Sequence, residues 1–134
     1  MRVRDALVGD VDAVAEIYAG YVRDTTVTFA EVAPGVEEWV GRVGDPRMPF
    51  LVVEVEGAVV GMAYCSPWKA KAAYRYTVES SVYLSPGAVG RGMGRVLLGV
   101  LLERAAVVGV REVIAVIVDG GERGFGEQGF GEGA

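Results

Sequence analysis

Apolar residues recur at spacings that divide most of the chain into helices and strands. A spacing of three to four positions predicts a helix over Asp10–Arg23, a shorter one that begins at Gly35, and a long one over Gly92–Gly109. The sequence Gly44-Asp45-Pro46 ends the second helix, since proline cannot continue it. Alternating or continuous apolar runs predict strands over Arg2–Arg4, Phe50–Val55, Ala58–Tyr64, Tyr76–Leu84 and Glu112–Val118.

The order of these elements is β-α-α-β-β-β-α-β, with a hairpin turn at Glu56-Gly57. This order predicts an α/β protein of the α+β type, in which helices flank a mostly antiparallel mixed sheet. Residues 24–34 look irregular. On the third helix, one face is expected to carry the apolar residues Val96, Leu97, Val100, Leu101 and Ala105.

The last part of the chain has a different composition. Residues 119–134 consist mainly of Gly and Glu with two Phe, and they predict neither helix nor strand. With 134 residues, the chain is long enough for one core and too short for two. We therefore expect one domain over residues 1–118, followed by a divergent glycine-rich tail.

Composition and charge exclude several classes of function. With 51% hydrophobic residues the chain should fold, yet no apolar run reaches the length of a membrane span. The net charge of −5 argues against a general binder of nucleic acids or anionic membranes. The N-terminus carries no apolar signal segment, so a cytoplasmic location is expected.

The chain has no histidine and a single cysteine, Cys65. The absence of histidine removes the commonest general base and the commonest metal ligand, so we expect no metal site. One cysteine excludes an internal disulfide and fits a reducing compartment. Since Cys65 lies within an apolar strand, we expect it to be inert packing.

The segment 85–95, Ser-Pro-Gly-Ala-Val-Gly-Arg-Gly-Met-Gly-Arg, is the clearest candidate for ligand binding. Glycine lets backbone N–H groups approach a ligand, and the first N–H groups of a helix are unpaired and partly positive. These features favour a phosphate or pyrophosphate site, although such a cluster is also typical of a tight turn. The loop is not a dinucleotide fingerprint, since Arg95 replaces the third glycine, and no Gly-Lys-Ser/Thr of a P-loop follows.

Residues outside the loop extend the pattern over most of residues 1–118. The segments concerned are Ile17-Tyr18, Thr25 to Phe29, Ala63-Tyr64, Pro67 to Ala70, Ala73 to Tyr83 and Ala115 to Ile117. Together with a strand–Pro–(Arg/Gln)-x-x-Gly-x-Gly–helix arrangement, they resemble the GNAT superfamily of acyl-CoA-dependent N-acetyltransferases. Within that superfamily the chain is similar to the phosphinothricin and methionine sulfoximine acetyltransferase branch.

The resemblance implies transfer of an acetyl group from acetyl-CoA to the primary amine of a small amino-acid-like substrate. In that scheme the loop N–H groups hold the pyrophosphate, and a strand end pairs with the pantetheine arm. The implied cofactor-binding residues are Val82, Tyr83, Leu84, Gly90, Arg91, Gly92, Met93, Gly94 and Arg95. Arg91 or Arg95 can add charge-assisted hydrogen bonds to the phosphates.

The resemblance also implies two catalytic residues on one strand. Glu79 would take a proton from the amine, directly or through a water, and Tyr83 would protonate the leaving thiolate. Alternation places Thr77, Glu79, Ser81 and Tyr83 on one strand face as a polar row. From the residues alone, Glu79 also fits a surface glutamate on a solvent-facing strand, and Tyr83 fits an aromatic packed on the sheet.

The substrate-binding residues implied by the resemblance are Phe29, Trp68, Lys69, Arg75 and Glu79. Arg75 can hold a carboxylate with two parallel hydrogen bonds, because a guanidinium presents paired donors. Lys69 can equally be solvated, and Phe29 and Trp68 can equally belong to the core. The implied partner is a small-molecule amine, and a homodimer is expected by analogy with the branch.

The chain departs from the family pattern in three places. Val89 occupies the first motif position, where a polar side chain normally helps to bind the cofactor, and such a bond is worth roughly 1.5–3 kcal/mol. After Val118 the branch carries Asn-x-x-Ser and a histidine-bearing helix, which residues 119–125 replace. We also expect the family's last strands to be missing. These departures leave open a catalytically impaired domain that binds acetyl-CoA or self-associates.

Overall fold

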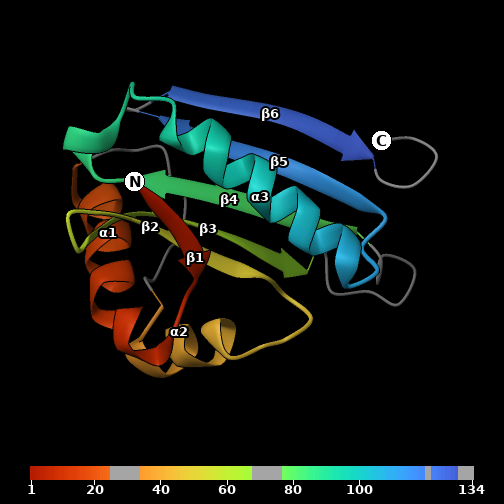
Figure 1. The fold of residues 1–134 in the computed structure, drawn as a ribbon, viewed down its shortest axis with the longest axis horizontal. Coiled ribbons are helices and arrows are strands. Elements are labelled where there is room, and N and C mark those ends of the chain that lie inside the picture. Colours follow the sequence, from red (N-terminus) through yellow and green to blue (C-terminus); the bar gives the residue numbers. More distant parts are fainter. Residues whose placement is uncertain (25–33, 68–76, 120–121, 130–134) are drawn as a thin grey trace.

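Figure 1 shows the computed structural model of the protein, which describes residues 1–24, 34–67, 77–119 and 122–129. Within these residues, six strands form one sheet, and their order across the sheet follows the chain order. The strands are β1 (Arg2–Asp5), β2 (Phe50–Val55), β3 (Ala58–Pro67), β4 (Thr77–Leu84), β5 (Glu112–Asp119) and β6 (Glu122–Gly129). Neighbouring strands are antiparallel except β4 and β5, which are parallel.

Helices pack against both faces of this sheet. The helices are α1 (Val11–Asp24), α2 (Val36–Val43) and α3 (Met93–Val107), with short 3₁₀ turns at Val8–Asp10 and Pro86–Ala88. The parallel pair β4 and β5 requires a crossover, and α3 supplies it while lying across β2, β3 and β4 (Figure 1). The helices α1 and α2 pack against each other on the opposite face. Among the described helices, none combines the length and the apolar character needed to cross a membrane.

The sheet separates two core layers, because successive residues of a strand point to opposite faces. The layer beneath α3 is mainly aliphatic and includes Leu51, Val53, Ala63, Cys65, Val78, Val82, Leu97 and Leu101. Burial raises the pKa of the Cys65 thiol to about 12, so the thiol stays protonated, as expected of inert packing. The layer beneath α1 and α2 is rich in aromatic residues, namely Tyr18, Tyr21, Trp39, Phe50, Tyr64 and Tyr83.

The fold class and the order of elements expected from the sequence are confirmed. The hairpin turn is confirmed as well, since Glu56 and Gly57 have φ angles of 52° and 82°, as a type I′ turn requires. One expectation for α3 is wrong: Val96 is 41% exposed. The buried face of the helix is formed instead by Met93, Leu97, Leu101 and Ala105.

The expectation that residues 119–134 contain no strand, and that the sheet ends at β5, is also wrong. The strand β6 pairs antiparallel with β5, from Asp119 opposite Glu122 to Glu112 opposite Gly129. Strand pairing satisfies backbone N–H and C=O groups whatever the side chains are, so tertiary context overrides an unfavourable composition. The segment 24–34, expected to be irregular, lies outside the described residues apart from its two ends.

Gly61 allows β3 to pass close to the end of β4. An added Cβ would lie 2.5 Å from Leu84 Cδ2, 2.9 Å from Val53 Cγ1 and 3.2 Å from the Tyr83 carbonyl oxygen. At such distances Leu84 and Val53 would have to shift to accommodate a Cβ, so the position favours glycine. Gly61 therefore helps to place the last residues of β4, from which the candidate site is built.

Candidate active site

The strands β4 and β5 stop pairing before either of them ends. Their parallel register ends with Val82 opposite Ile117, although β4 continues to Leu84 and β5 to Asp119. On its other side, β4 stays paired with β3 as far as Leu84. The backbone of Tyr83 and Leu84 on the β5 side is therefore outside the ladder, where an extended ligand with amide groups can pair with it.

The glycine loop follows β4 and leads into α3. Gly90 and Gly92 have φ angles of 85° and 79°, left-handed conformations that favour glycine. Gly92 is the N-cap of α3, and the Val96 N–H donates to its carbonyl oxygen at 3.2 Å. The N–H groups between Gly92 and Val96 belong to the first helical turn and have no intrahelical partner. No described side chain caps this end of the helix. The start of α3 is thus a partly positive end.

The start of α3 lies close to the end of β4. A Cβ added to Gly94 would be 3.6 Å from Leu84 Cδ1, which is ordinary van der Waals contact. Met93 is buried in the core, whereas Arg91 and Arg95 are exposed. The arginine side chains are free to reach an anion at the helix start, while Met93 contributes only its backbone N–H.

Val89, which departs from the family motif, packs against the core layer beneath α3. Its N–H donates to the Pro86 carbonyl oxygen at 3.4 Å. A valine offers a ligand no side-chain hydrogen bond, so an anion at this loop depends on backbone N–H groups and on the two exposed arginines.

The polar row on β4 lies on the face covered by α1 and α2. Val78 and Val82 belong to the layer beneath α3 and Tyr83 belongs to the aromatic layer, so the expected alternation is confirmed. Glu79 is partly buried, and Ser81 and Tyr83 are only 8% and 7% exposed. The interpretation of an open, solvent-facing strand is therefore wrong for the second half of the row.

Tyr83 is packed among other aromatic rings. Its centroid lies 5.5 Å from that of Tyr18 and 5.3 Å from that of Tyr21, both edge-on, and 6.3 Å from that of Tyr64, nearly parallel. Burial raises the pKa of Tyr83, and the nearby Tyr64, Tyr18 and Glu79 raise it further. The phenol is therefore protonated at neutral pH, and the raised pKa makes it a weaker acid than a free tyrosine. The packed-aromatic interpretation is confirmed, and the role of Tyr83 as a proton donor stays a prediction.

The residues expected to bind the substrate fall mostly in a part of the chain that the structure does not describe. Phe29, Trp68, Lys69 and Arg75 lie outside the described residues, so of this set the structure places Glu79 alone. Their assignment stays a prediction from the sequence.

Sequence reasoning missed Tyr64 as part of the site. Its ring lies nearly parallel to that of Tyr83, with a centroid distance of 6.3 Å. The signal was present in the hairpin pattern, because Tyr64 pairs with Ser81 in the β3–β4 register. That register depends on the length of the connection between the two strands, which the pattern alone does not give.

Comparison with known families decides what kind of protein carries this site. The model of the acetyltransferase (GNAT) family matches residues 14–126, which include the glycine loop and all of β2 to β5. The chain belongs to the GNAT acetyltransferase family. The GNAT match also extends beyond Val118 into β6.

Within the GNAT family, the chain is similar to enzymes that acetylate amino-acid-like compounds. The chain is 41% identical over 115 residues to the phosphinothricin N-acetyltransferase of Alcaligenes faecalis. This alignment covers 84% of the chain and 58% of that protein. It is 32% identical over 128 residues to the L-methionine sulfoximine/L-methionine sulfone acetyltransferase of Pseudomonas paraeruginosa. This alignment covers 92% of the chain and 74% of that protein.

A solved structure confirms the GNAT fold. The phosphinothricin acetyltransferase from Sinorhizobium meliloti, in complex with AcCoA, matches with a TM-score of 0.77 and 38% identity, covering 87% of this chain and 65% of that one. The chain thus spans less than two thirds of the length of both phosphinothricin enzymes.

Proposed function

We propose that this GNAT chain transfers the acetyl group of acetyl-CoA to the primary amine of a small amino-acid-like substrate, of the phosphinothricin or methionine sulfoximine type. The observation that carries the proposal is the separation of β4 from β5 next to the start of α3. The similarity to phosphinothricin and methionine sulfoximine acetyltransferases supports the substrate class. The Sinorhizobium meliloti complex supports acetyl-CoA as the cosubstrate.

Two parts of the chain would hold acetyl-CoA. The backbone of Val82, Tyr83 and Leu84 would pair with the amides of the pantetheine arm at the end of β4. The N–H groups of residues 90–95, Met93 and Gly94 included, would bind the pyrophosphate, with Arg91 and Arg95 adding charge. Such binding would place the thioester beside the polar row of β4, and orientation alone can supply effective molarities of about 10⁵ M or more.

The polar row would then carry the proton transfers. Glu79 takes a proton from the amine, whose nitrogen attacks the thioester carbonyl carbon. The C–S bond breaks, and the sulfur leaves with the electron pair and receives the hydroxyl proton of Tyr83. Glu79 then releases its proton to solvent and the Tyr83 phenolate takes one up, so both residues are reset. A positioned acid or base contributes about 10²–10⁴-fold to the rate.

The substrate would be recognised by residues that the family resemblance implies. Arg75 would bind the substrate carboxylate through paired N–H donors, with Lys69 as a further cation. Phe29 and Trp68 would form apolar walls of the pocket. These roles rest on the family resemblance, and Glu79 is the member of the set that lies on the described part of β4.

A second candidate function is a GNAT domain that binds acetyl-CoA weakly or associates with a second copy, without catalysis. The packing of Val89 against the core favours it, because this position offers the cofactor no polar side chain. Under either function, we propose that residues 1–118 are the cofactor-binding domain and that the chain can form a homodimer.

The substitution Glu79→Gln tests the proposed function. It keeps the size of the side chain and removes the base, so kcat with phosphinothricin or methionine sulfoximine should fall about 10²-fold or more. Acetyl-CoA should still raise the melting temperature of the variant as it does that of the wild type.

Glu103→Gln is the matched control, because Glu103 is an exposed glutamate on α3. Its kcat should equal that of the wild type. If Glu79→Gln also kept the wild-type kcat, Glu79 would not be the base. If the wild type bound acetyl-CoA and acetylated no amine, the second candidate function would hold.

A further inference from the structure

A guanidinium from α2 lies against the aromatic layer, in the corner between two buried rings. The rings of Trp39 and Tyr64 meet edge to face, with an interplanar angle of 84° and a centroid distance of 5.8 Å. The Arg42 guanidinium lies 5.1 Å from the centre of the Trp39 ring and 5.6 Å from that of Tyr64. Aromatic faces attract a cation, so the two rings hold this guanidinium against the layer.

Arg42 keeps hydrogen-bond donors for a ligand. Its side chain is 35% exposed, whereas Trp39 and Tyr64 beneath it are 1% and 4% exposed. Its Nη2 donates to Glu38 Oε2 at 2.5 Å, which is its one hydrogen bond to a described residue. A guanidinium has five N–H donors, so most of them stay available. Paired N–H donors match an anion with two oxygens, such as a carboxylate or a phosphinate.

The strand register places Arg42 near the proposed base. Tyr64, on whose ring the guanidinium lies, is opposite Ser81 in the β3–β4 register. The next pair on the same face is Ser66 opposite Glu79, about 7 Å further along the strands. Both residues of the first pair are buried, and both residues of the second pair are only partly buried. The buried layer ends at this step, so Arg42 and Glu79 lie at the same edge of it.

We propose that Arg42 binds the anionic end of the substrate's side chain, while the amine of the same molecule lies at Glu79. This inference rests on the proposed function and narrows its substrate class to amino acids whose side chain ends in a two-oxygen anion. A side chain of a few carbon atoms bridges a distance of the order of one step along the strands.

The charge of the side-chain end is what Arg42 distinguishes. Phosphinothricin ends in a phosphinate anion, whereas the sulfone group of methionine sulfone is neutral. Hydrogen bonds between two charged groups are about twice as strong as those between neutral groups. Arg42 therefore favours substrates of the phosphinothricin type over neutral ones.

The substitution Arg42→Gln tests this selection with two substrates. The ratio of kcat/KM for phosphinothricin to kcat/KM for methionine sulfone should fall about 10-fold, as expected for the loss of a charge-assisted hydrogen bond. Arg47→Gln is the matched control, because it removes the same charge from a side chain that is 86% exposed and pairs with Asp45 at 3.7 Å. Its ratio should equal that of the wild type.

A second variant, Arg42→Lys, keeps the positive charge and loses the paired donors. Its ratio should lie between those of Arg42→Gln and the wild type. The inference is overturned if the ratio is unchanged in both Arg42 variants. It is also overturned if Arg42→Gln lowers kcat/KM equally for both substrates, since Arg42 would then act on the fold or on the part that the two molecules share.

Phosphorus NMR tests the contact without acetyl transfer. With free CoA present, the ³¹P resonance of phosphinothricin should shift when the wild type or Arg47→Gln is added, and the shift should be much smaller with Arg42→Gln. A resonance that the wild type leaves unchanged, or that Arg42→Gln shifts equally, overturns the inference. Failure of the wild type to release CoA with any amine would instead refute acetyl transfer, and the NMR result would still decide whether Arg42 holds the phosphinate.

Discussion

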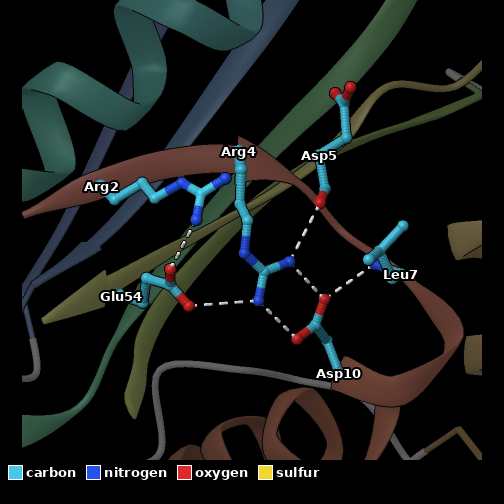
Figure 2. Close-up of polar contacts among 6 residues, drawn as sticks. All are labelled: Arg2, Arg4, Asp5, Leu7, Asp10 and Glu54. Atoms are coloured by element: carbon cyan, nitrogen blue, oxygen red, sulfur yellow. Dashed lines mark hydrogen bonds and ion pairs between the residues drawn. The ribbon is translucent and has the colours of Figure 1, made fainter. Parts of the chain in front are cut away.

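The guanidinium of Arg4 donates hydrogen bonds to both carboxylate oxygens of Asp10, at 2.8 and 2.9 Å (Figure 2). The same guanidinium contacts Glu54 Oε2 on β2 at 3.3 Å, and the Leu7 N–H donates to Asp10 at 2.7 Å. The two side chains of the central pair are 21% and 10% exposed. This network ties the start of α1 to β1 and β2, and α1 in turn packs on Tyr83.

Asp10→Asn should lower the free energy of unfolding by about 2 kcal/mol, because it removes the charge of the carboxylate that accepts two hydrogen bonds from the half-buried Arg4 guanidinium. Chemical denaturation at neutral pH measures this change. Glu38→Gln is the control, since Glu38 pairs with Arg42 at 2.5 Å on an exposed helix surface. Its effect should stay within about 0.5 kcal/mol. Equal losses for the two variants would contradict the special role of Asp10.

The same pair predicts a pH dependence of stability. The hydrogen bonds from Arg4 lower the pKa of Asp10 from its ordinary value of 3.8, and the Leu7 N–H adds to this effect against the cost of burial. A lowered pKa in the folded state gives stability that is complete above the unfolded value and is lost as the pH falls through the folded value. The stability gap between wild type and Asp10→Asn should therefore narrow below about pH 4 in urea unfolding. A gap that is constant with pH would show that the pKa of Asp10 is the same in the folded and the unfolded protein.

Gly61→Ala should destabilise the protein by about 1–3 kcal/mol, because the new Cβ would overlap Leu84 and Val53. It should also lower kcat, since the added Cβ would lie 3.2 Å from the Tyr83 carbonyl oxygen. Gly99→Ala is the comparison: Gly99 is exposed on α3, and its added Cβ would meet no described atom within 4 Å. That variant should gain about 0.5–1 kcal/mol in thermal or chemical unfolding.

Ser80→Ala should stabilise the protein. The Ser80 side chain is fully buried in the sheet, and its Oγ has no hydrogen-bond partner among the described residues. Removing an unpaired buried hydroxyl should raise the free energy of unfolding by about 1 kcal/mol. A loss of stability in Ser80→Ala would show that its hydroxyl has a partner in solution.

Local patterns were sufficient for much of the fold. Gly35 and Gly44 mark the ends of α2 as their positions in the sequence predict, and positive φ angles at Glu56 and Gly57 make the expected hairpin. The polar row on β4 follows from alternation alone. In each case the determining interactions lie within a few residues along the chain.

Long-range pairing explains what the sequence did not predict. The contact of Tyr64 with Tyr83 depends on the β3–β4 register, and the Arg4–Asp10–Glu54 network depends on which strand neighbours β1. The strand β6 depends on an open edge of β5 and not on its own composition. These relationships are fixed by tertiary structure, which a single sequence leaves open.

Acetyl transfer itself is tested most directly by incubating the wild type with acetyl-CoA and phosphinothricin, with methionine sulfoximine in parallel. Free CoA is measured with a thiol reagent, and the N-acetyl product is measured by mass spectrometry. The account predicts one CoA released for each amine acetylated, at a rate that saturates with both substrates. A protein that acetyl-CoA stabilises against heat, but that forms no N-acetyl product from either amine, would contradict it.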